Sequence, residues 1–203
     1  MRVEERNKRF IIAGYSPRLS EVPIEFYATG TVIGVNQTYR QINTYLDAWL
    51  LWDHHITTTH REMHDAIETV QAPKFIRNDD GGNNWKKWGS YRGIFWYEGS
   101  DNQPLHQLPL TWENPLRLKI SGSSITAACN LALILGATEI ILVGVDFIGN
   151  KRLGGWEYLI NDLDKNCQYA CEYFKTFPIP VYKTVKESKL SLPFMNLGVK
   201  WIL

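Results

Sequence analysis

Residues 120–147, ISGSSITAACNLALILGATEIILVGVDF, contain the pattern that decides the fold of this chain. Residues 125–136 form an apolar run with small residues on one side. A cluster of serines that can cap a helix precedes the run, and Gly136, a typical helix terminator, closes it. Residues 140–146 form a nearly all-apolar strand that ends in aspartate, as central strands of parallel sheets do. A helix followed by such a strand predicts an α/β fold.

Further apolar runs predict the other strands of this sheet. The expected strands are Phe10–Gly14, Thr31–Asn36, Ala48–Asp53, Pro73–Arg77, Ile140–Asp146 and Pro180–Lys183. Helical patterns are expected over 57–70 and 162–176. We therefore expect a single Rossmann-like domain over residues 1–203, with a parallel sheet and helices on both faces.

Residues 78–115 have a different character from the rest of the chain. They are rich in Gly, Asn, Trp and Tyr and show no helical period. A strand over 93–98 is one alternative within this stretch. The stretch as a whole favours an irregular insertion, a long loop or lid, because such long loops are usually functional or mobile.

Composition narrows the class of protein. Hydrophobic residues make up 44% and charged residues 21% of the 203 positions, which is typical of a globular chain. A net charge of +1 offers no large basic field, so we expect no binding to duplex nucleic acid. We see no secretory signal and no membrane span, and we expect a cytoplasmic protein. A homo-oligomer is compatible with this composition.

The three cysteines do not form the framework of a secreted disulfide-rich domain. Cys129 falls in the apolar helical run. Cys167 and Cys171 are four positions apart on an expected helix and therefore share a face. Two interpretations are open for this pair, a metal pair or two buried small residues, and the second is favoured.

Polar residues end several of the expected strands, namely Asn36, Asp53 and Asp146. Ligands of open α/β sheets bind at the carboxyl ends of strands, so these residues are candidates for a site. Ser121 and Gly122, in front of a long helix, offer free N–H groups and a hydroxyl to a phosphate or ribose. The alternatives are ordinary turn formation at the strand ends and ordinary helix capping.

Catalytic groups are expected among the same strand ends. Asp53 and Asp146 are candidates for a base or for holding a metal–phosphate unit, and either His54 or His55 is a candidate base. His60 and His64 have the spacing of a metal-binding pair, but a solvated or hydrogen-bonding role is favoured for them. We predict no dedicated metal site.

Four groups of residues resemble one known superfamily, in the same order along the chain. They are Ile11-Ile12-Ala13-Gly14-x-x-Pro17-x-Leu19, Val35-Asn36-Gln37, Ile120-Ser121-Gly122 and the segment Leu133–Phe147. They resemble bacterial lipooligosaccharide sialyltransferases and the wider group that includes archaeal-type 6-hydroxymethylpterin diphosphokinases. The resemblance implies a Rossmann-like domain whose strand ends bind a nucleotide, which in the sialyltransferases is part of a CMP-sugar donor.

The resemblance also implies roles for individual residues. Asn36, Ser121 and Gly122 match nucleotide-contacting positions, and Asp53 falls at or near another. The first turn of the transferases, Gly-Asn-Gly-Pro-Ser, corresponds here to residues 14–18, which makes Gly14 and Ser16 candidate nucleotide contacts.

Two catalytic features of the transferases are replaced in this chain. Ile148 stands where they have a tyrosine, and no histidine follows His106.

These observations predict a nucleotide-binding transferase, a glycosyltransferase relative that uses a nucleotide or nucleotide-sugar donor. One alternative is a diphosphokinase-like enzyme that uses a nucleoside triphosphate, with Mg²⁺ held by Asp53 and Asp146. A non-catalytic nucleotide-binding protein is the other alternative. In all three, the partner is a small-molecule nucleotide.

Overall fold

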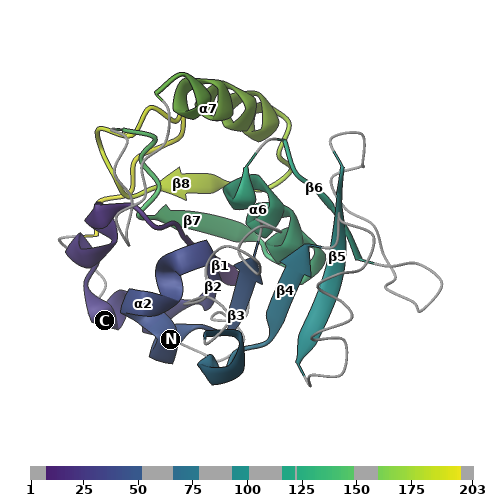
Figure 1. The fold of residues 1–203 in the computed structure, drawn as a ribbon. Helices are drawn as coiled ribbons and strands as arrows, with labels where there is room; N and C mark the ends of the chain where they lie inside the picture. The colour runs from purple at the N-terminus through teal and green to yellow at the C-terminus, as the bar shows by residue number, and fades with distance from the viewer. Residues whose placement is uncertain are drawn as a thin grey trace.

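In the computed structural model, the described residues form a sheet of eight parallel strands (Figure 1). The structure describes residues 8–51, 66–77, 93–100, 116–121, 123–148 and 160–197. The strands are β1 (Arg9–Ala13), β2 (Thr31–Val35), β3 (Ala48–Leu51), β4 (Lys74–Arg77), β5 (Ile94–Ser100), β6 (Leu116–Lys119), β7 (Glu139–Val143) and β8 (Val181–Lys183).

The strand order places β1 near the middle of the sheet. The order is β6-β5-β4-β3-β2-β1-β7-β8, and Ile12 of β1 pairs with Ile33 of β2 and with Leu142 of β7. The chain adds strands in one direction from β1 to β6 and then crosses back to place β7 on the other side of β1. This reversal creates a switch point at the carboxyl ends of β1 and β7, where open α/β sheets bind ligands. The Rossmann-like parallel sheet is confirmed.

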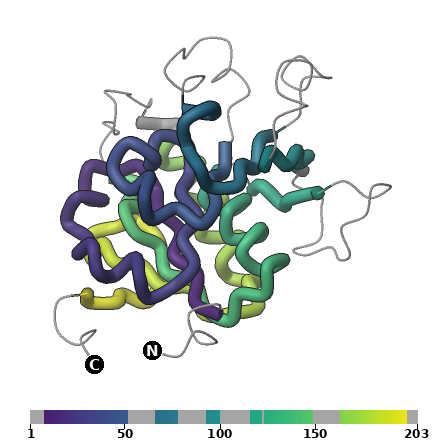
Figure 2. Tube along the Cα trace, turned by 90° about the horizontal axis from the view of Figure 1, so that it is seen from below, coloured from purple at the N-terminus to yellow at the C-terminus, as the bar shows by residue number. Residues whose placement is uncertain are grey.

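Helical segments cover both faces of the sheet. One face carries α6 (Ser124–Ile134) and α7 (Ile160–Lys175). The other face carries η1 (Pro17–Glu21), η2 (Ile24–Thr29), α2 (Tyr39–Ile42) and residues 66–69. The short helices η3 (Asn36–Thr38) and η4 (Asn43–Tyr45) join α2 to its neighbouring strands. Figure 2 shows η1, η2 and α2 in purple and blue, on the opposite side of the sheet from α6 in green.

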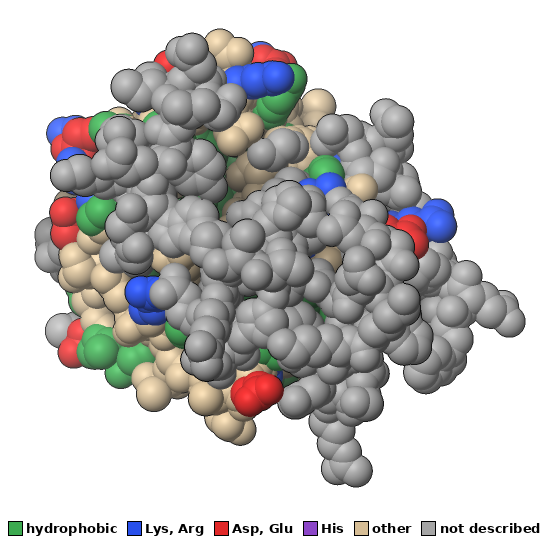
Figure 3. All heavy atoms as spheres, in the orientation of Figure 1, with side chains coloured by type: hydrophobic (Ala, Val, Ile, Leu, Met, Phe, Trp, Pro, Cys, Tyr) green, Lys and Arg blue, Asp and Glu red, His purple; other side chains and the backbone are tan. Residues whose placement is uncertain are grey.

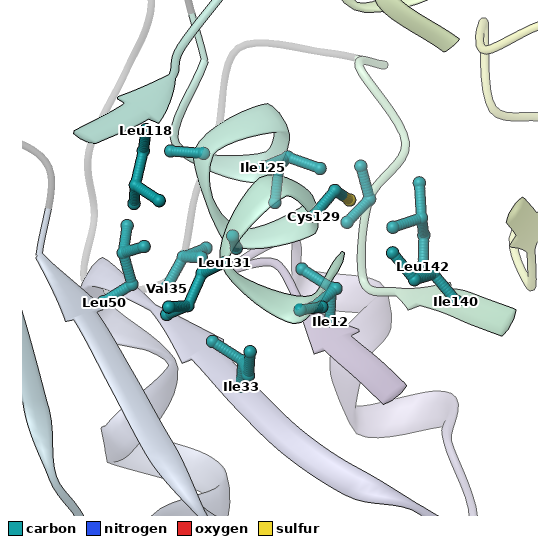
Figure 4. Packing of buried hydrophobic residues seen from close by; sticks show 14 of the residues in the cluster. Ile12, Ile33, Val35, Leu50, Leu118, Ile125, Cys129, Leu131, Ile140 and Leu142 are labelled. Carbon is teal, nitrogen blue, oxygen red and sulfur yellow. The ribbon is translucent and has the colours of Figure 1, made fainter. Parts of the chain in front are cut away.

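The two faces bury alternate residues of the central strands. In β1, Ile12 packs toward α6, and Ile11 packs toward η1 and η2. Figure 4 shows Ile12, Ile33 and Leu142 from three adjacent strands gathered around α6. Burial of each such side chain contributes roughly 1.5–3 kcal/mol. The strands therefore depend on both helical layers, as buried parallel strands do.

Helix α6 is buried along most of its length because its side chains are small or apolar. The Ser123 hydroxyl caps its N-terminus by accepting the N–H of Ile125 at 3.2 Å. Gly136 ends the helix with a φ of 91°, and the N–H of Ala137 donates to the carbonyl of Ala132 at 3.0 Å. This is a Schellman motif, in which glycine is favoured at the left-handed position. Gly136 therefore terminates the helix, as the sequence predicted.

The strand alternative within residues 78–115 is the one found, because 94–100 form β5 between β4 and β6. Strand β6 was not predicted. It has four residues, of which Leu116 and Leu118 are buried and the two between and after them are half-buried, which is too short an alternation to recognise. Residues 78–92 and 101–115 lie outside the described residues, so a lid over them stays a prediction.

Residues 193–195 extend the sheet beyond β8. The N–H of Lys183 donates to the carbonyl of Pro193 at 2.9 Å, and the N–H of Met195 donates to the carbonyl of Lys183 at 2.8 Å. The Lys183 ammonium donates to the carbonyls of Ser188 and Leu190, each at 2.8 Å. These bonds hold the intervening loop against the last strand.

Exposed charged side chains of opposite sign pair at several places on the described surface. On the face drawn in Figure 3, the Lys and Arg side chains lie among Asp and Glu side chains, and no single patch collects them. Exposed ion pairs such as Arg117–Glu98 account for part of this mixing. Across the ranges described above, no helix combines the length and apolar character that a membrane crossing requires.

Two buried tyrosines provide a matched test of the core. The Tyr97 hydroxyl donates to the carbonyl of Leu51 at 3.2 Å, whereas the Tyr173 hydroxyl has no partner among the described residues. Tyr97→Phe should lower the free energy of unfolding by about 1 kcal/mol, and Tyr173→Phe should leave it unchanged or raise it. Urea unfolding of both variants measures the difference. Equal losses in the two variants would contradict these hydrogen-bond assignments.

Candidate functional site

The carboxyl ends of β1 and β7 approach each other closely at the switch point. The N–H of Gly14 donates to the carbonyl of Val143 at 2.8 Å, and the N–H of Ser16 donates to the carbonyl of Gly144 at 3.1 Å. A Cβ at position 14 would lie 2.5 Å from the Gly144 oxygen. Glycine at 14 is therefore explained by strand packing, and its contact with a nucleotide stays a prediction.

A buried hydrogen bond joins the two strand ends across the switch point. The Ser16 hydroxyl donates to Oδ2 of Asp146 at 2.5 Å, and both residues are buried. Oδ1 of Asp146 accepts the N–H of Ile148 at 3.2 Å, and the Asp146 carbonyl accepts the N–H of Lys189 at 3.0 Å. The bonds from Ser16 and Ile148 hold the carboxylate in one orientation.

Left-handed backbone conformations gather at the carboxyl edge of the sheet. In the described residues, three non-glycine residues have positive φ: Asn36 at 48°, Ser121 at 35° and Phe147 at 53°. Each follows the carboxyl end of a strand, β2, β6 or β7 respectively. Such conformations cost on the order of 1–3 kcal/mol each and cluster at functional sites. Gly144 also has positive φ at this edge, whereas at the amino edge the described positive-φ residues, Gly93 and Gly136, are both glycines.

Asn36 begins η3 directly after β2. Its side chain is buried, and its carbonyl accepts the indole N–H of Trp49 at 2.6 Å. Trp49 is itself wholly buried and stacks edge-on against Tyr39 at 5.1 Å between ring centroids. Asparagine tolerates the left-handed region better than most residues, which is a structural reason for its presence here. Trp49 was not singled out from the sequence, because a tryptophan within an apolar strand gives no sign of such a contact.

The turn that carries Ser121 is held by α6. The N–H of Ser123 donates to the carbonyl of Ile120 at 2.9 Å, which closes a turn around Ser121. The buried Thr126 hydroxyl contacts that same Ile120 carbonyl. Because Ser123 caps the helix, Ser121 is not the cap. Ser121 is half-buried, and its hydroxyl has no hydrogen-bond partner among the described residues.

Asn130, farther along α6, holds the strand that leads into this turn. Its Oδ1 accepts the N–H of Lys119 at 2.7 Å, and the residue is wholly buried. Its Nδ2 has no partner within the described ranges, which costs about 1–3 kcal/mol. In the described residues, Asn130 therefore gains one buried hydrogen bond through Oδ1 and leaves one buried donor, Nδ2, unpaired.

The structure brings together some of the predicted site residues. Gly14, Ser16 and Asp146 meet at the switch point, and Asn36 ends the strand next to β1. Ser121 lies at the same edge but follows β6, with three strands between β6 and β2. Helix α6 connects the two regions, because it starts beside Ser121 and contacts β1, β2 and β3.

Three other predicted site residues, Asp53, His54 and Gly122, lie outside the described residues. Among the described residues, no three or more His, Cys, Asp or Glu side chains are grouped as a metal site requires. The pairing of Asp53 with Asp146 around Mg²⁺ stays a prediction.

Comparison with known proteins bears on the fold. No family model matches the chain, and no curated protein matches it. A solved structure that is similar is the monofunctional α-2,3-sialyltransferase Cst-I from Campylobacter jejuni. The two superpose with a TM-score of 0.52 and 14% identity, over 92% of this chain and 80% of the transferase chain. At this identity the likeness shows the α/β fold, which agrees with the sialyltransferase half of the resemblance noted in the sequence.

The close approach at the switch point can be tested with two glycines. Gly144 has a φ of 59°, and an added Cβ would lie 3.0 Å from the Gly14 oxygen and 3.0 Å from Leu19. Gly136 also has positive φ, but an added Cβ would meet nothing within 4 Å. Gly144→Ala should cost about 2–4 kcal/mol of unfolding free energy, against about 1–2 kcal/mol for Gly136→Ala. Thermal unfolding of both variants checks this, and equal costs would refute the packing argument.

The hydrogen bond between Ser16 and Asp146 can be tested against a neighbouring serine. Ser16→Ala leaves a buried carboxylate oxygen without its donor and should cost about 1–3 kcal/mol. Ser20→Ala, in the same η1 region, removes an exposed bond to the Pro17 carbonyl and should change stability by less than about 0.5 kcal/mol. Urea midpoints of the two variants would coincide if the buried bond contributed nothing.

Proposed function

We propose that this chain is a nucleotide-dependent transferase, a glycosyltransferase relative that binds a nucleotide-sugar donor at the carboxyl edge of its sheet. The observation that supports this most is the location of Asn36, Ser121 and Phe147. Strained non-glycine conformations follow three separate strands and all fall at the one edge where Rossmann-like sheets bind ligands. Stability alone would favour glycine at Ser121 and Phe147.

The described groups at this edge suit a nucleotide. Ser121 offers a hydroxyl that is not used for capping, next to the N-terminus of α6, whose dipole favours a phosphate. Asn36 places an amide side chain at the end of β2. Gly122 and Asp53, which belong to the same prediction, would add a close backbone approach and a second carboxylate.

Asp146 is the described residue best placed to take a proton. Its carboxylate lies at the switch point, and its orientation is held by Ser16 and by the N–H of Ile148. In the proposed transfer, an acceptor hydroxyl attacks the anomeric carbon of the sugar, and the nucleotide leaves with its phosphate. The acceptor proton passes to a general base. We assign that role to Asp146, with Asp53 and His54 as the other candidates from the sequence.

The binding proposal is tested by screening ligands with two edge variants. CMP, CMP-sugars, UDP-sugars and ATP with and without Mg²⁺ are tested by thermal shift, where a ligand at about 100 times its Kd adds about 2.7 kcal/mol. Asn36→Gly and Ser121→Gly keep a left-handed backbone and remove only the side chain. Each should weaken binding of the nucleotide by about tenfold, ~1.4 kcal/mol, measured by calorimetry.

The matched control is Thr138→Ala, which removes an exposed hydroxyl at the amino edge, where it donates to the carbonyl of Lys8 at 3.3 Å. Its nucleotide affinity should equal that of the parent. A parent that binds none of these nucleotides, or edge variants that bind as tightly as the parent, would refute the site. Binding of ATP alone, with a requirement for Mg²⁺, would favour the diphosphokinase alternative. Tight nucleotide binding without turnover would favour the non-catalytic one.

A further inference from the structure

One face of α7 presents two thiols, one helical turn apart. Cys167 and Cys171 are four residues apart, the spacing that brings side chains together on a helix. Cys167 is buried against the core, Cys171 is half-buried, and both are free thiols. Both side chains lie on the core side of the helix, Cys167 within the main hydrophobic cluster and Cys171 packed against it. The pair lies on the outer helix of the domain, apart from the residues proposed for nucleotide binding.

Lys189 links these thiols to the carboxyl edge. The Cys171 thiol donates to the Lys189 carbonyl at 3.9 Å, and the Lys189 ammonium pairs with Asp164 at 2.6 Å. The N–H of Lys189 donates to the carbonyl of Asp146. Lys189 therefore contacts both the Cys171 thiol and Asp146, the residue that follows β7.

Cys167 is a protonated thiol at neutral pH. Burial, together with a smaller effect of the neighbouring Cys171, raises its pKa to about 12. A thiol in this state is a poor nucleophile, because the thiolate is the reactive form.

The helix spacing disfavours a disulfide between the two cysteines. Side chains at this spacing have Cβ atoms about 5–6 Å apart, whereas a disulfide needs about 3.5–4.5 Å. A metal ion bound between the two sulfurs allows a larger separation of the Cβ atoms than a disulfide does. Two metal–sulfur bonds of about 2.3 Å separate the sulfurs by up to about 4.6 Å, compared with about 2.05 Å in a disulfide.

We propose that Cys167 and Cys171 bind one soft, thiophilic metal ion of the Cu(I) class as a two-coordinate dithiolate. Thiolate ligands select such ions, whereas structural Zn²⁺ needs four ligands. In the described part of the chain, no third His, Cys, Asp or Glu completes a larger group. Binding forms two metal–sulfur bonds, releases both thiol protons to solvent and changes no oxidation state. Once Cys171 has lost its proton, it no longer donates to Lys189.

The proposal is tested by anaerobic titration of the full chain with Cu(I), in competition with a chromophoric Cu(I) chelator. We expect one Cu(I) per chain with release of about two protons. Cys167→Ala and Cys171→Ala should each weaken binding by more than about 100-fold, because even second-shell changes cost about 10–100-fold. Cys129→Ala, which removes the buried thiol of α6, should leave affinity unchanged.

A variant with altered cysteine spacing distinguishes a site that needs both thiols on one helix face from nonspecific binding of Cu(I) to any cysteine. Cys171→Ala combined with Glu172→Cys keeps three cysteines but moves one thiol off the shared face, and circular dichroism verifies that the helix remains. Binding by this variant as tight as that of the parent would overturn the proposal. Ready formation of a Cys167–Cys171 disulfide with the helix intact would overturn the geometric argument. No step of this experiment uses a nucleotide, so its outcome is independent of the proposed function.

Discussion

The close contact between the carboxyl ends of β1 and β7 is the constraint on which the rest of the structure depends. Two glycines, Gly14 and Gly144, allow the backbones to meet, and Ser16 then reaches Asp146 across the gap. Without this contact, β7 could not sit beside β1, and the chain could not reverse direction in the sheet. The same contact orients the carboxylate of Asp146, so the residues that pack the two strands together also position this candidate site residue.

Helix α6 both packs against the central strands and holds the turn around Ser121, and these two roles require different kinds of side chain. Packing against β1, β2 and β3 requires small and apolar side chains, which it has on nearly all sides. Holding the turn around Ser121 requires polar side chains inside the core, which Thr126 and Asn130 provide. Nδ2 of Asn130 has no hydrogen-bond partner among the described residues, so holding this turn lowers the free energy of unfolding.

Long apolar patterns made most of the fold predictable from sequence. The runs that form β1, β2 and β7 are buried on both faces and could be recognised by composition alone. Strand β6 could not, because its four residues alternate between buried and half-buried at the edge of the sheet. The site was predicted as a set of strand-end residues. The bond from Ser16 to Asp146 and the support of Asn36 by Trp49 were not, because both depend on residues that are distant in sequence or hidden in an apolar run.

The segment at 193–195 has a consequence for how molecules of this protein meet. A last strand with free N–H and carbonyl groups is a template for pairing with another chain. Here Pro193 and Met195 occupy the backbone groups of Lys183, and the Lys183 ammonium ties down the loop in between. A second copy could add a strand at β8 only after stripping this segment away. The backbone of Lys183 is therefore already paired within the chain, and addition of another strand directly at this residue would require displacement of the segment.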